Sequence, residues 1–126
     1  MKQKENILVV AREPEWQTFV TQALRKAGYN VYLAHDKTSA LGVIAGYQPD
    51  LIIVDATLAD LLKTLAWQSV DNRLMVVTAT PSVAEAVSAY RYGALDYVSK
   101  AFDIAGLLEA VTTALQKQPV RQRLLV

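Results

Sequence analysis

The chain has 126 residues, of which 52% are hydrophobic and 20% are charged, a composition typical of one globular domain and unlike that of a disordered chain. A formal net charge of +1 favours neither nucleic acid nor an anionic membrane as a partner, and the absence of cysteine excludes disulfides and thiolate zinc sites. The apolar runs are far shorter than a membrane span, and the N-terminus lacks the apolar stretch of a signal peptide, so we expect a cytoplasmic protein.

Short apolar runs alternate along the chain with segments of helical periodicity. The apolar runs predict five strands, near residues 6–11, 30–34, 51–55, 73–78 and 95–99. The segments between and after them predict five helices, near residues 14–27, 37–46, 58–68, 82–92 and 104–117.

Capping residues and apolar stripes support these helices. Helix starts are marked by prolines and aspartates suited to the first turn or the N-cap, namely Pro14, Asp36, Pro81 and Asp103. Helix ends are marked by glycines, namely Gly28, Gly46 and Gly93. Three helices show stripes that we expect to face the core: Trp16, Phe19, Val20, Ala23, Leu24 and Ala27; Val83, Ala86, Val87 and Tyr90; and Ile104, Leu107, Leu108, Val111 and Leu115.

This alternation predicts an α/β fold in which helices cover both faces of a five-stranded parallel sheet, giving three layers. Three of the strands are almost uniformly apolar, as expected when both faces of a sheet are covered. We expect residues 1–117 to form this domain. Residues 118–126, where Pro119 interrupts the helical pattern, are expected to form a polar tail or a linker that leads to an output domain outside this chain.

Polar residues end three of the apolar runs, and sites in open sheets form at the carboxyl ends of strands. Asp55, Thr78 and Lys100 occupy these ends. A carboxylate can act as a nucleophile, a hydroxyl can donate to a phosphoryl oxygen, and an ammonium can stabilise developing negative charge. The three residues therefore predict a phosphoryl-accepting pocket. The first strand, however, ends in Ala11 and Arg12, where a pocket of this type would use two acids.

From about residue 5 to residue 117 the chain resembles the receiver domain of two-component response regulators. The matching segments are residues 7–10, 49–55, 76–79 and 93–102. The resemblance implies the CheY-like, flavodoxin-like (βα)5 fold with strand order 2-1-3-4-5 and a part in phosphorelay signal transduction. It also implies roles for single residues: Asp55 matches the phosphoacceptor, Thr78 and Lys100 match residues that contact the phosphoryl oxygens, and Tyr97 matches an aromatic residue that changes rotamer.

One departure from that family concerns the metal. Ala11 and Arg12 replace the acidic pair that holds magnesium, and Glu13 lies one position beyond the expected ligands. A hard dication needs oxygen ligands, usually carboxylates, whereas Asp55 would be flanked by two cations. Unit charges about 4 Å apart interact by ~4 kcal/mol at an effective dielectric constant of ~20. We therefore expect Arg12 to pair with Asp55 in place of a metal, magnesium binding to be lost or weak, and no other cofactor.

Two further departures lie elsewhere. Ala101 follows Lys100 where the family usually has a proline in a cis linkage. A cis bond costs ~2.5–4 kcal/mol before a residue other than proline, so we expect a trans bond and a rearranged loop that can displace Lys100. The segment between Asp55 and Thr78 is short for the family, and we expect Trp67 within it to be exposed and available to a partner.

The sequence admits three interpretations of Asp55: a phosphorylation site in use, a vestigial acceptor paired with Arg12 or Lys100, and an inert strand-end carboxylate. The leading hypothesis for function is an atypical receiver, or pseudo-receiver, that acts through protein contacts without magnesium-dependent phosphorylation. One alternative is a phosphorylatable receiver that accepts a phosphoryl group on Asp55 from a histidine kinase. Another is a flavodoxin-like ligand binder, although no glycine-rich loop follows the first strand.

The resemblance also implies partners. These are a signalling protein, either a histidine kinase or an attached output domain, and a second copy of the domain in a homodimer. By resemblance, the face for such contacts includes Arg91, Asp96 and Tyr97. We expect no direct contact of this domain with nucleic acid or a membrane. We also expect no enzymatic activity of its own, because no histidine-containing or paired-acid constellation is visible.

Overall fold

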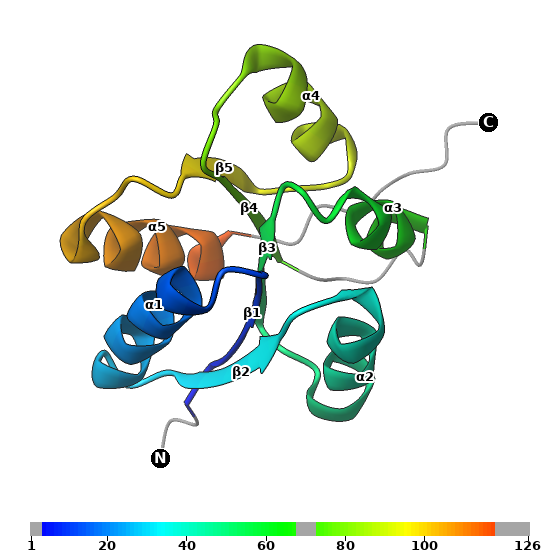
Figure 1. Ribbon diagram of the computed structural model, residues 1–126. Helices are drawn as coiled ribbons and strands as arrows, with labels where there is room; N and C mark the ends of the chain where they lie inside the picture. The colour runs from blue at the N-terminus through cyan, green and yellow to red at the C-terminus, as the bar shows by residue number, and fades with distance from the viewer. Residues whose placement is uncertain (1–3, 68–72, 118–126) are drawn as a thin grey trace.

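A computed structural model describes residues 4–67 and 73–117 of the chain. Its five parallel strands form one sheet in the order β2-β1-β3-β4-β5, and helices cover both faces of that sheet (Figure 1). The strands are β1 (Asn6–Val10), β2 (Asn30–Ala34), β3 (Leu51–Asp55), β4 (Leu74–Thr78) and β5 (Asp96–Ser99). The helices are α1 (Pro14–Lys26), α2 (Lys37–Tyr47), α3 (Ala59–Trp67), α4 (Val83–Arg91) and α5 (Ile104–Gln116). The predicted fold class and strand order are confirmed.

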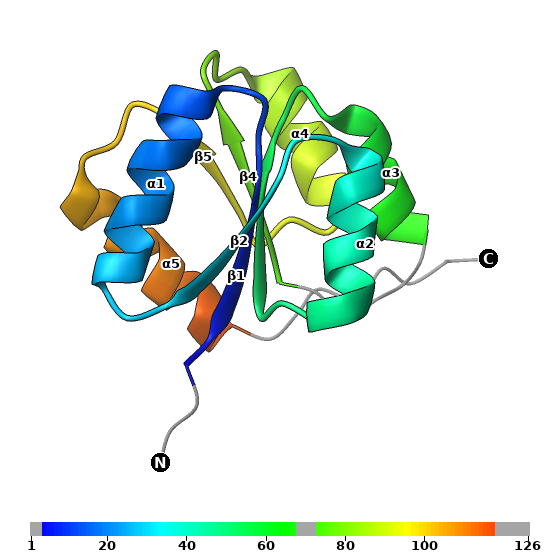
Figure 2. The same cartoon turned by 60° about the horizontal axis from the view of Figure 1, so that its bottom comes forward.

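The sheet separates two apolar layers. Helices α1 and α5 lie on one face, and α2, α3 and α4 lie on the other (Figure 2). Side chains along a strand point alternately to the two faces. In β1, Ile7 and Val9 accordingly pack on the side of α1 and α5, whereas Leu8 and Val10 pack on the side of α2, α3 and α4. All four are fully buried, as expected for a central strand of a parallel sheet covered on both faces.

The predicted helix boundaries lie within one residue of the observed ones. Asp36 and Asp103 are N-caps whose carboxylates accept hydrogen bonds from Ser39 N (2.8 Å) and Gly106 N (2.7 Å). After α1 and α4, Gly28 and Gly93 adopt the left-handed conformation, with φ of 103° and 94°, which a glycine adopts with little strain.

The predicted end of α2 at Gly46 is wrong by one residue. The helix continues through Tyr47, and Gln48 then takes the left-handed conformation at φ 48°, while its N–H still donates to Ile44 O. The Tyr47 ring stacks on Tyr32 of β2, with 4.3 Å between the ring centroids. We attribute the longer helix to this contact, because it fixes the last turn of α2 against the neighbouring strand.

The apolar stripe predicted to bury α4 lies largely in solvent. Val83, Val87 and Tyr90 are 82%, 45% and 51% exposed, and within α4 the buried residue is the small Ala89. Phe19 of α1 and Ile104 of α5 are also exposed, against expectation. An apolar stripe in the sequence identifies one side of a helix, but the helix can pack on the sheet through an adjacent row of small residues instead.

Trp67 is 75% exposed, as predicted. Within residues 4–67 and 73–117, none of the helices has both the length and the apolar character needed to cross a membrane. The predicted tail at 118–126 lies outside the described residues.

Candidate functional site

The polar residues predicted to form a site meet at one edge of the sheet. Strand register pairs Val10 with Val54, Asp55 with Val77, and Thr78 with Ser99. The ends of β1, β3, β4 and β5 are therefore level with one another. Asp55 and Thr78 close their strands, and Lys100 directly follows β5.

Asp55 is the buried acid of this edge, with 5% of the residue exposed. Its Oδ1 accepts hydrogen bonds from the backbone N–H and the hydroxyl of Thr57, both at 2.9 Å, and its Oδ2 contacts the Lys100 ammonium. Burial acts to raise the pKa of the Asp55 carboxyl, but the bonds from Lys100 and Thr57 together outweigh it, so the net shift lowers that pKa. The carboxylate is thus held ionised, with both oxygens in contact with donors.

Lys100 links two carboxylates. Its Nζ contacts Glu13 Oε1 as well as Asp55 Oδ2, and its side chain is only 7% exposed. Burial acts to lower the pKa of Lys100, but the hydrogen bonds to Asp55 and Glu13 outweigh it and raise that pKa. The peptide bond between Lys100 and Ala101 is trans, as predicted. The contact with Asp55 is kept, so the expected displacement of Lys100 does not occur.

Trp16 forms one wall beside the ammonium. Lys100 Nζ lies 4.8 Å from the centroid of the Trp16 ring, within the range of a cation–π attraction. Phe102 packs against the same tryptophan, with ring centroids 6.3 Å apart. The Trp16 ring thus lies beside an ammonium whose side chain is only 7% exposed, and low exposure to water strengthens the ion pairs of Lys100 with the two acids.

The predicted pairing of Arg12 with Asp55 is wrong. Arg12 is exposed, and the structure gives Asp55 the partners Lys100 and Thr57 instead. Arg12 lies near Asp36: the pKa of that carboxyl is lowered chiefly by the Ser39 N–H, and the charge of Arg12 contributes least. The loop after β1 turns Arg12 outward, while Ala11 remains fully buried at the strand end.

Thr78 and Tyr97 belong to the β4–β5 side of the edge. Thr78 is buried, and its hydroxyl accepts a bond from Thr80 N at 3.1 Å. The Tyr97 hydroxyl accepts from Ser82 N at 3.2 Å and donates to the Glu85 carboxylate at 2.6 Å. Tyr97 is thereby fixed against the start of α4. Burial and the bond to Glu85 raise the pKa of its phenol.

The side chains at this edge of the sheet are poorly suited to bind magnesium. Magnesium prefers oxygen ligands in octahedral geometry. Two carboxylates, Asp55 and Glu13, lie here, and one ammonium already contacts both. Ala11 and Arg12 bring no carboxylate to the end of β1. Among the described residues, no group of three or more histidine, cysteine, aspartate or glutamate side chains could hold a metal ion.

Sequence reasoning missed three neighbours of the pocket. Thr57 could have been found from the turn that an aspartate favours, in which its carboxylate accepts from the backbone two residues on. The sequence predicts no contact for Glu13, because the direction of its side chain depends on the path of the loop after β1. Trp16 carries no local signal beyond its place in the apolar stripe of α1.

Comparison with known proteins agrees with this geometry. Residues 7–112 match the family model described as "Response regulator receiver domain". The chain is 32% identical over 116 residues to response regulator MprA of Mycobacterium tuberculosis (strain H37Rv), covering 88% of this chain and 50% of that protein. It is 29% identical over 123 residues to the regulatory protein AtoC of Escherichia coli (strain K12), covering 94% of this chain and 27% of that protein.

Solved structures share the fold. A response regulator from Thermotoga maritima superposes with a TM-score of 0.84 at 24% identity, covering 91% of this chain and all of that one. A response regulator protein from Burkholderia pseudomallei, whose structure contains a phosphorylated aspartic acid, a calcium ion and citrate, gives a TM-score of 0.76 at 29% identity, covering 90% of this chain and 68% of that one. The chain thus spans half of MprA and about a quarter of AtoC, and it belongs to the receiver domain family of two-component response regulators.

Proposed function

We propose that this domain is an atypical receiver that signals through protein–protein contacts, without magnesium-dependent phosphorylation of Asp55. One observation supports the proposal above all others. The Lys100 ammonium contacts both Asp55 and Glu13, at an edge where Ala11 and Arg12 supply no carboxylate. In this proposal the ammonium takes over the charge-neutralising role of the divalent ion.

The exchange of a dication for an ammonium has a chemical consequence. A bound metal neutralises the transferring phosphoryl group and also fixes the geometry of the attacking and leaving oxygens. The ammonium of a lysine is a single charge with three donors and no coordination geometry. Oδ1 of Asp55 accepts two hydrogen bonds and Oδ2 contacts the Lys100 ammonium. These donors stabilise the negative charge of the carboxylate, which makes it a weaker nucleophile toward a phosphodonor than a carboxylate without such donors.

The same proposal covers the setting of the domain. We propose no enzymatic activity and no bound cofactor, a cytoplasmic location, and a signalling partner that is either a histidine kinase or an output domain joined through residues 118–126. The partial coverage of MprA and AtoC supports an attached output domain. A homodimer is a further arrangement within the proposal, and nucleic acid and membranes are not expected to contact this domain directly.

Intact-mass spectrometry after incubation with acetyl phosphate tests the proposal. The wild-type protein and the Asp55→Asn variant are compared with magnesium and with a chelator. We expect no added phosphoryl group on either protein in either condition. A magnesium-dependent adduct that appears on the wild type and is absent from Asp55→Asn would overturn the proposal.

A specific observation supports a second candidate, a receiver that is phosphorylated slowly. Asp55, Thr78 and Lys100 lie together at the strand ends, and the Burkholderia pseudomallei relative has a phosphorylated aspartic acid. Arginine binds phosphate through two parallel hydrogen bonds, and Arg12 is exposed at this edge. This candidate predicts an adduct that forms equally in chelator. It would fail if Asp55→Asn took up the phosphoryl group as readily.

A further inference from the structure

A cleft of about 450 Å³ opens between α3 and α4, on the face of the sheet that carries α2, α3 and α4. Its floor is formed by apolar side chains from β4, α3 and α4, namely Val76, Leu62 and Ala89, all of which are buried. Ala56, the residue after Asp55, forms part of its wall. A volume of this size lies in the range of small-molecule sites, about 300–1,000 Å³.

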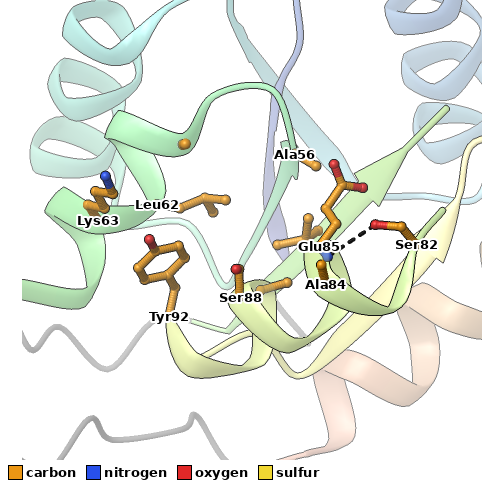
Figure 3. A pocket seen from close by; sticks show the side chains of 11 residues that line it. Ala56, Leu62, Lys63, Ser82, Ala84, Glu85, Ser88 and Tyr92 are labelled. Carbon is orange, nitrogen blue, oxygen red and sulfur yellow. Dashed lines mark hydrogen bonds between the residues drawn. The ribbon is translucent and has the colours of Figure 1, made fainter. Parts of the chain in front are cut away.

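The walls of this cleft carry opposite charges. Figure 3 shows Lys63 of α3 on one side and Glu85 of α4 on the other, with the hydroxyls of Ser88 and Tyr92 between them. Lys63 forms no ion pair with any residue in the described ranges. The Glu85 carboxylate uses one oxygen, Oε1, to accept from Tyr97. The cleft therefore offers a cation at one side, an anion at the other, and an apolar floor.

Glu85 connects the cleft to Tyr97. The Tyr97 hydroxyl donates to Glu85 Oε1 at 2.6 Å and accepts from Ser82 N at 3.2 Å, and Ser82 and Glu85 both line the cleft. The Ser82 hydroxyl caps α4 by accepting from Glu85 N at 3.1 Å. A group that binds Glu85 would thus act directly on the hydrogen bond that fixes Tyr97.

We propose that this cleft binds a small zwitterionic molecule, with its carboxylate at Lys63, its ammonium at Glu85 and an apolar body on the floor between them. Charge complementarity selects this class, because a ligand with one charge would satisfy one wall only. An ammonium at the second oxygen of Glu85 holds the carboxylate where Tyr97 donates to it, so binding stabilises Tyr97 in its present position. The site does not depend on whether Asp55 accepts a phosphoryl group.

Amide chemical shifts in a ¹⁵N-labelled sample test the proposal. The probes are 4-aminobutanoate, 6-aminohexanoate and 8-aminooctanoate, whose charges are separated by different lengths of apolar chain. Their controls are hexanoate and hexylamine, which carry one charge each. We expect at least one zwitterion to shift the Ser82, Glu85 and Ser88 resonances saturably at millimolar concentration, and to bind several-fold more tightly than either control.

Matched variants test whether Lys63 and Glu85 bind the two charged groups of the ligand. Exposed ion pairs are worth ~0.2–1 kcal/mol, so Lys63→Gln and Glu85→Gln should each weaken binding of the best zwitterion by about 1.4- to 5-fold. Lys37→Gln, on α2 and away from the lining of the cleft, should leave binding unchanged. Tyr97→Phe should retain binding but lose most of the ligand-induced shift at Ser82 N.

Five outcomes would overturn the proposal. Four of them are the absence of saturable shifts with any zwitterion, equally tight binding of hexanoate or hexylamine, binding unaffected by either Lys63→Gln or Glu85→Gln, and shifts centred away from the cleft. Concentration-dependent broadening of the same resonances without ligand would also overturn it, because the occupant would then be a second copy of the chain.

Discussion

The two sides of the sheet edge that carries Asp55 differ sharply. On the side of β3, β4 and β5, the carboxylate, hydroxyl and ammonium expected of a receiver lie together, and Asp55 and Lys100 are in contact. On the side of β1, the buried Ala11 and the outward Arg12 stand where the family has acids. One half of the site thus carries the side chains that match the phosphoryl-contacting residues of the family, whereas the other half brings no carboxylate to the end of β1.

This difference shows how the edge balances its charge. The ammonium of Lys100 lies between Asp55 and Glu13, while the additional cation, Arg12, faces solvent. A buried carboxylate left without a partner would be costly. We therefore interpret the pair of Asp55 and Lys100, covered by Trp16, as the arrangement that stabilises this edge without an ion.

The largest effect should come from restoring the acids on the β1 side. The double variant Ala11→Asp, Arg12→Asp adds two carboxylates to Asp55 and Glu13 at the strand ends, and a dication can bind among these four groups. We expect the magnesium affinity to rise at least about tenfold, equivalent to ~1.4 kcal/mol. The measurement is magnesium titration of Trp16 fluorescence in a Trp67→Phe background. Adding Asp55→Asn should abolish the gain; a gain that survives it would place the ion elsewhere.

Removing the ammonium tests the other side. Lys100→Met leaves Asp55 buried with Thr57 as its donor, and we expect a loss of about 1–3 kcal/mol in the free energy of unfolding at neutral pH. Urea denaturation measures it. The double variant Asp55→Asn, Lys100→Met should lose less than Lys100→Met alone, because no buried carboxylate then lacks an ion-pair partner. A larger loss in the double variant would contradict the ion-pair interpretation.

The pH dependence of stability follows from the same pair. The pKa of Asp55 is lower in the folded state, so its contribution to stability is present above the ordinary aspartate pKa of about 3.9 and is lost as pH falls through the folded value. The raised pKa of Lys100 gives a contribution that is present below about pH 10.4 and is lost as pH rises further. Urea midpoints measured between these limits should be nearly flat with respect to this pair.

Asp55→Asn should reduce the acid-side slope without removing it, because Asp36 also has a lowered pKa. Asp36→Asn, which keeps a side chain suited to the N-cap, is the matched comparison. An unchanged acid slope in Asp55→Asn would show that this carboxyl titrates alike in the folded and unfolded states.

The smallest expected effects on the free energy of unfolding come from replacing Glu13 or Arg12, and their difference shows which of the two belongs to the charge network. The Glu13 side chain is 60% exposed, so Glu13→Gln should cost about 0.2–1 kcal/mol and less at high salt. Arg12→Gln should change the free energy of unfolding by less than about 0.5 kcal/mol. Both are measured by urea denaturation at low and high salt. A larger loss for Arg12→Gln would mean that Arg12, rather than Glu13, belongs to the charge network.

Sequence patterns predicted the fold better than the side-chain geometry of the site. Apolar runs and caps predicted the elements to within one residue because both signals are local. Gly46 does not end α2 as predicted, because that end depends on the distant contact of Tyr47 with Tyr32. The positions of Asp55, Thr78 and Lys100 followed from the alignment of parallel strand ends. The directions of the Arg12 and Glu13 side chains could not be predicted in this way, because they depend on the path of the loop after β1. The exposed stripe of α4 was likewise not predictable, because the apolar periodicity of the sequence does not indicate that α4 packs through the small residue Ala89.

Diffraction from crystals soaked in magnesium tests the role of Lys100 most directly. We predict that the Lys100 ammonium will stay in contact with Asp55 and Glu13, and that no ion will be bound to Asp55. An octahedral magnesium ion ligated by Asp55, with Lys100 displaced from the carboxylate, would contradict that prediction.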